Sequence, residues 1–136
     1  MKALPAEALE ALRDPTISLP AYAKIIDQKT GREIRYDPYA ITDKLQATVV
    51  GYYSNPPVTD MGQVKWLNLL GYRQGGKSLT AEACGYVKAA YTPGCDHVCI
   101  ADTKDRAEYL HRRVHLIHQN WPDVVRADTV PNREVR

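Results

Sequence analysis

The stretch VKWLNLLGYRQGGKS, residues 64–78, combines two features that together predict the fold. Residues 64–70 are a nearly continuous apolar run of strand length, as expected for a strand that is buried on both faces of a sheet. The residues that follow fit the pattern G-x-x-x-x-G-K-[ST], a loop that binds phosphate between a strand and a helix. Because the pattern and its context agree, we predict a phosphate-binding loop.

The chemistry of phosphate binding explains the residue types in this loop. Gly71 and Gly76 permit a tight turn in which successive backbone N–H groups point at phosphate oxygens. Lys77 would carry positive charge to the β- and γ-phosphates, and Ser78 would offer its hydroxyl to Mg²⁺. The expected ligands are ATP and Mg²⁺. The predicted nucleotide-binding residues of the loop are Gly71, Tyr72, Arg73, Gln74, Gly75, Gly76, Lys77, Ser78 and Leu79.

The residues after the loop continue an α/β pattern. Residues 79–91 have helical spacing, residues 96–102 (DHVCIAD) are typical of a second buried strand, and residues 105–121 carry a clear apolar stripe. The order strand, loop, helix, strand, helix predicts an α/β fold with a partial parallel sheet flanked by helices.

The first part of the chain has a different pattern. Residues 4–12 predict a short helix, and residues 21–37 predict a β-hairpin with Ile25 and Ile26 on one strand, Ile34 and Tyr36 on the other, and a turn at residues 29–31. A further helix is expected over residues 41–52, with Thr42 and Asp43 as capping candidates. We therefore expect an N-terminal extension over residues 1–40 and the N-terminal portion of a P-loop domain over residues 41–136.

Composition is that of an ordinary globular protein. The 136 residues suffice for one compact domain, with 44% hydrophobic and 25% charged residues and a net charge of +2. This charge is too close to zero to indicate nucleic-acid binding by itself. No long apolar run is present and the first residues lack the apolar core of a signal peptide, so we expect a cytoplasmic protein with free, buried thiols at its three cysteines.

The loop sequence RQGGKS resembles the ATPase domain of phage terminase large subunits, the motors that package viral double-stranded DNA. Two further segments are similar to that family in the same order: YDPYAITDKLQ before the loop and HVCIADTKDRAEYLHRRV after it. The resemblance covers about residues 36–121. It implies an ASCE, RecA-like P-loop fold, and as partners double-stranded DNA, a terminase small subunit, a portal protein and further copies in a homo-oligomeric ring. It places the protein in the host cytoplasm.

The resemblance also implies residue roles. Arg73 would stabilise or sense charge at the γ-phosphate, and with Lys77 it forms the predicted catalytic set. Gln46 would contact adenine. The structural alternatives are a solvent-facing loop position for Arg73 and an exposed helix position for Gln46.

Hydrolysis requires an acidic residue for Mg²⁺ and a glutamate that activates water. The family has both at the end of a later strand, whereas here the only apolar run after the loop that ends in an acid reaches Asp102, which Thr103 follows. We interpret Asp102 as a strand-end cap and expect the chain to be part of a motor, inactive alone and without the nuclease domain. The alternative is a non-catalytic P-loop module for nucleotide binding or assembly. A small-molecule kinase or GTPase is less favoured, because no N-K-x-D motif is present.

Two groups of residues could suggest a metal site. Cys95, His97 and Cys99 alternate along one segment, a spacing that does not surround a tetrahedral metal. A second group, with helical spacing but no acidic or thiol partner at that spacing, consists of His111, His115 and His118. Packing and solvation are the favoured interpretations of both.

Overall fold

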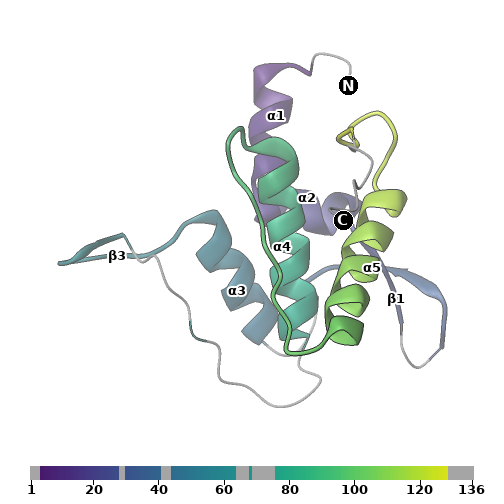
Figure 1. Ribbon diagram of the computed structural model, residues 1–136. Coiled ribbons are helices and arrows are strands. Elements are labelled where there is room, and N and C mark those ends of the chain that lie inside the picture. The colour runs from purple at the N-terminus through teal and green to yellow at the C-terminus, as the bar shows by residue number, and fades with distance from the viewer. Residues whose placement is uncertain (1–3, 28–29, 41–43, 64–67, 69–75, 129–136) are drawn as a thin grey trace.

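The computed structural model describes residues 4–27, 30–40, 44–63, 68 and 76–128. These residues form helices and pairs of short strands (Figure 1). In chain order the elements are α1 (Ala6–Arg13), α2 (Pro15–Tyr22), β1 (Lys24–Ile26), β2 (Glu33–Arg35), α3 (Lys44–Ser54), β3 (Val58–Thr59), β4 (Gly62–Gln63), α4 (Lys77–Tyr91) and α5 (Lys104–Asn120). In the described part of the chain, no helix is both long and apolar enough to cross a membrane.

Helix α4 is the centre of the molecule. It packs against α1, α2, α3 and α5, and Figure 1 shows it standing between α3 and α5. Its small residues Ala83, Cys84 and Gly85 are buried, which allows the neighbouring helices to approach closely. The core also takes in the first part of the chain, because Leu19 and Tyr36 belong to the same buried cluster as the α4 residues. The expected N-terminal extension therefore shares one core with the helices that follow it.

The predicted N-terminal elements are confirmed. The helix expected over residues 4–12 is α1. Helix α2 was not predicted, and Asp14 caps it by accepting a hydrogen bond from the backbone N–H of Thr16. Strands β1 and β2 form the expected antiparallel hairpin, with Ile25 opposite Ile34. The helix expected over residues 41–52 is α3, but the capping candidates Thr42 and Asp43 lie outside the described residues.

The two helices predicted after the loop are also confirmed, as α4 and α5. Thr103 caps α5 by accepting a hydrogen bond from the backbone N–H of Arg106. Both helices run in the same direction, and an extended segment returns along α4 to connect the end of one to the start of the other (Figure 1).

The buried strand predicted over residues 96–102 is wrong. Residues 95–101 are extended but belong to no strand, and the side chains of Val98 and Ile100 are 75% and 88% exposed. The cause is one-sided burial: Cys95, His97 and Ala101 are half-buried, while the residues between them face solvent. Of the first predicted strand, residues 64–70, only Asn68 is described. Within the described residues both sheets are small and antiparallel, so the parallel sheet stays a prediction.

Candidate nucleotide site

The structure describes the last part of the predicted loop. Gly71, Tyr72, Arg73, Gln74 and Gly75 lie outside the described residues, whereas Gly76, Lys77, Ser78 and Leu79 lie within them. Gly76 precedes α4 in the left-handed conformation, with φ 72° and ψ 4°, which glycine adopts without strain. Its carbonyl accepts the first helical hydrogen bond, from the N–H of Thr80 at 2.9 Å. The glycine of the G-K-S sequence thus turns the chain directly into a helix.

A cavity of about 850 Å³ opens at this helix start. Three parts of the fold form it: the first turn of α4, the β1–β2 hairpin and the middle of α5. Its volume falls within the range of small-molecule sites. The described residues that line it are Ile25, Ile26, Asp27, Ile34, Gly76, Lys77, Ser78, Leu79, Tyr109, Arg112, Arg113, Leu116 and Ile117.

The lining of this cavity separates into an apolar part and a cationic part. Isoleucines of the hairpin and Tyr109 supply apolar and aromatic surface. The charged lining residues are three cations, Lys77, Arg112 and Arg113, and one carboxylate, that of Asp27. The first turn of α4 adds the positive end of its dipole. Such an arrangement can hold an anion beside a flat, apolar group.

Arg113 is fixed from two sides. Its Nε lies 3.2 Å from Oε2 of Glu82, and its Cζ lies 5.3 Å from the ring centroid of Tyr109. Glu82 is only 3% exposed, and neither of its carboxylate oxygens has a hydrogen-bond partner of good geometry. Burial raises the pKa of Glu82 to about 7, although the charge of Arg113 acts in the opposite direction. The ion pair joins α4 to α5 behind the cavity wall.

The opposite side of α4 carries a neutral network. The Tyr36 hydroxyl donates to Oε1 of Gln46 at 2.9 Å and lies 2.6 Å from Oγ1 of Thr80. The Thr80 hydroxyl donates to the Gly76 carbonyl at 2.9 Å. Burial raises the pKa of Tyr36 well above its usual value, so its hydroxyl keeps its proton. The network connects the end of the hairpin with the glycine at the helix start.

Gln46 is in close contact with Gly76. The side chain of Gln46 is 8% exposed, and a Cβ added to Gly76 would lie 2.3 Å from its Nε2. The alternative of an exposed helix position for Gln46 is therefore wrong. Gln46 is not among the described residues that line the cavity, and its role in adenine recognition stays a prediction.

Asp102 lies at the start of α5. Its Oδ2 accepts a hydrogen bond from Arg106 at 2.7 Å, both side chains are exposed, and Asp102 is not among the described lining residues of the cavity. The interpretation of Asp102 as a strand-end cap is wrong, because the residues before it form no strand and Thr103 is the residue that caps α5.

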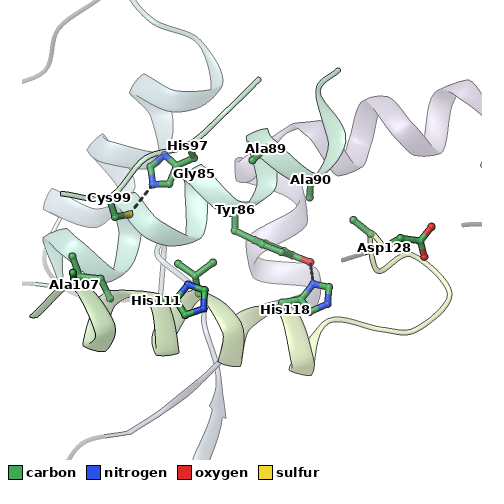
Figure 2. Close-up of a pocket in the computed structure, with 13 residues that line it drawn as sticks. Gly85, Tyr86, Ala89, Ala90, His97, Cys99, Ala107, His111, His118 and Asp128 are labelled. Atoms are coloured by element: carbon green, nitrogen blue, oxygen red, sulfur yellow. Dashed lines mark hydrogen bonds between the residues drawn. The ribbon is translucent and has the colours of Figure 1, made fainter. Parts of the chain in front are cut away.

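A second cavity, of about 410 Å³, lies between α4, α5 and the extended segment (Figure 2). The ring of His97 covers Gly85, where an added Cβ would lie 2.3 Å from Nε2, and this nitrogen is 3.3 Å from Sγ of Cys99. His118 Nδ1 is 3.2 Å from the Tyr86 hydroxyl. Burial lowers the pKa of both histidines. Within the described residues no group of three potential ligands could hold a metal ion.

All three cysteines are free thiols, as predicted, but the predicted burial holds only for Cys84, because Cys95 is half-buried and Cys99 is exposed. Sequence reasoning missed Glu82, Tyr109 and Arg113 as site residues. For Glu82 a signal existed: it lies one helical turn after Ser78, between the apolar residues Ala81 and Ala83, where a carboxylate is unexpected. The sequence alone does not distinguish Arg113 from the other basic residues of α5, because it does not show which side of that helix packs against α4.

Comparisons of this chain with protein-family models, curated proteins and solved structures find no match.

Proposed function

We propose that this chain binds ATP with Mg²⁺ at the start of α4. The observation that carries the proposal is the G-K-S sequence, which turns through a left-handed glycine into a helix whose first residues line a cationic cavity of nucleotide size. Lys77 binds the β- and γ-phosphates, Ser78 contributes its hydroxyl to the metal, and the N-terminus of α4 stabilises their negative charge. The isoleucines and Tyr109 offer apolar surface to the base or ribose.

We further propose that the chain is the ATP-binding portion of a terminase large subunit, the ATPase that translocates double-stranded DNA into procapsids. The sequence RQGGKS and the order of its flanking segments support this assignment. The parallel course of α4 and α5, with the chain returning between them, is compatible with a RecA-like sheet. Arg73 would act on the γ-phosphate, and DNA, a small subunit, a portal protein and a homo-oligomeric ring would be the partners.

Isothermal titration calorimetry with Mg²⁺-ATP tests nucleotide binding. Lys77→Ala should abolish detectable binding, because it removes the charge that reaches the phosphates. Lys104→Ala is the matched control, since Lys104 is 88% exposed and is not among the described residues of the cavity. Unaltered binding by Lys77→Ala would show that the loop assignment is wrong.

Turnover separates the motor from the alternative, a non-catalytic P-loop module. The isolated chain should release no phosphate, with or without double-stranded DNA, because the Asp102 carboxylate is paired with Arg106 and no glutamate follows it. A longer chain carrying an Asp-Glu strand should hydrolyse ATP. Phosphate release by the isolated chain that disappears in Lys77→Ala would instead assign the metal to Asp102, with Glu108 as the candidate base. No turnover by the longer chain would favour the module.

A further inference from the structure

Arg113 occupies a position that simple helix packing does not explain. It belongs to α5, yet its side chain lines the cavity together with Lys77 and Ser78, which begin α4. The side chain is 20% exposed, so it is largely desolvated while still reaching the cavity surface. A partly desolvated guanidinium interacts with an anion more strongly than an exposed one does.

Glu82 and Tyr109 restrict where this guanidinium can point. Glu82 contacts Nε, the nitrogen nearest the backbone, and leaves the two terminal nitrogens to other partners. The Tyr109 ring lies against the guanidinium carbon. An arginine held in this way binds a phosphate at lower entropic cost, because its planar fork is already oriented.

The state of Glu82 argues against a purely stabilising ion pair. A buried carboxylate is costly unless its oxygens are well hydrogen-bonded, and the oxygens of Glu82 are not. An apolar residue at this position in the buried face of α4 would avoid that cost. The pair is therefore better explained by what it does for Arg113 than by what it contributes to folding.

We propose that Arg113 is a second cationic ligand of the phosphate chain, opposite Lys77, and that Glu82 is the residue that positions it. This inference rests on the proposed nucleotide site. Because the contact is with phosphate oxygens, it applies equally to a nucleotide and to inorganic tripolyphosphate.

The experiment compares variants by titration with Mg²⁺-ATP and with tripolyphosphate. Arg113→Gln should weaken both ligands about tenfold or more, the loss expected for one charge-assisted contact. Glu82→Gln, which retains the guanidinium but removes its anchor, should weaken both by a smaller factor. Arg113→Lys should restore only part of the affinity, since lysine lacks the planar fork.

Two controls separate binding from folding. Arg106→Gln removes the same charge from the same helix at an exposed position that is not among the described cavity residues, and should leave both affinities unchanged. The double variant E82Q/R113Q leaves no buried carboxylate without a partner, so it should retain the wild-type circular dichroism spectrum while it loses affinity.

The outcomes distinguish the inference from the function on which it rests. If Lys77→Ala abolishes binding while the folded Arg113→Gln and E82Q/R113Q variants bind tripolyphosphate as the wild type does, the inference is overturned and the nucleotide site stands. If the wild type binds neither ligand, both are overturned. A loss for ATP alone, with tripolyphosphate unaffected, would mean that Arg113 contacts the nucleoside and would also overturn the inference.

Discussion

The two sides of the first turns of α4 carry different kinds of polar contact. On the side of α3, neutral groups of Tyr36, Gln46 and Thr80 bond to one another and to the Gly76 carbonyl. On the side of α5, a buried carboxylate and a guanidinium meet without good hydrogen bonds to the carboxylate oxygens. Both arrangements lie within a turn or so of Lys77.

This difference indicates which side supports the backbone and which side serves the ligand. A neutral hydrogen-bonded network contributes to stability and fixes one geometry, here the left-handed turn at Gly76. A buried ion pair seldom gains as much as its desolvation costs, so its presence suggests a role in binding. Substitutions on the α3 side should therefore act on folding and loop geometry, and those on the α5 side on affinity and pH dependence.

The largest expected effect is that of Gly76→Ala. A Cβ at this position is strained by the positive φ and collides with the Gln46 amide, so the free energy of unfolding should fall by about 2–5 kcal/mol. Gly31→Ala is the matched control: its φ is +66° but nothing lies within 4 Å of the added atom, and it should lose only about 1–2 kcal/mol. Urea denaturation of both variants measures the difference, and equal losses would show that Gln46 yields without cost.

The next effect is a pH dependence that belongs to the α5 side. The pKa of Glu82 is 4.5 in the unfolded chain and about 7 in the folded protein, so the folded state binds more protons between these values. The free energy of unfolding should therefore fall as pH rises from 4.5 to about 7, by on the order of 3 kcal/mol, and then level off.

Glu82→Gln tests this dependence, because it has no proton to lose. Denaturation curves at pH 4.5, 6 and 8 should show a smaller decrease for Glu82→Gln than for the wild type. Glu108→Gln, in which the altered side chain is 54% exposed, should retain the wild-type slope. An unchanged slope in Glu82→Gln would mean that the carboxylate is solvated well enough to titrate normally.

A smaller effect is expected from Tyr36→Phe on the α3 side. The substitution removes one hydroxyl and leaves Oε1 of Gln46 without that donor in a buried setting, which should cost about 1–3 kcal/mol of unfolding free energy. Tyr39→Phe, at a side chain that is 49% exposed, should cost much less. Equal costs in thermal unfolding would contradict a structural role for the network.

The sequence predicted local structure well and long-range contacts poorly. Amphipathic spacing located α3, α4 and α5, and the apolar pairs around Gly31 located the hairpin, because these patterns depend on neighbouring residues. The prediction of a buried strand around Val98 failed, because an apolar run is buried only if other elements pack against both of its faces. The cavity also required knowledge of the fold, since Tyr109 and Arg113 reach the start of α4 only through the packing of α5.

The smallest expected effect concerns Gln46, and its pattern matters more than its size. If Gln46 contacts adenine, Gln46→Ala should weaken ATP more than GTP. Its amide instead accepts a bond from Tyr36 and touches Gly76, so we expect both nucleotides to lose affinity equally, by about 1 kcal/mol, through a less fixed phosphate turn. Calorimetry with both Mg²⁺-nucleotides measures this, with Thr48→Ala, an exposed position on the same helix, as the control. A selective loss of affinity for ATP would require the Gln46 amide to leave Tyr36 and turn toward the base. In that case Tyr36→Phe, which frees the amide, should bind ATP more tightly relative to GTP.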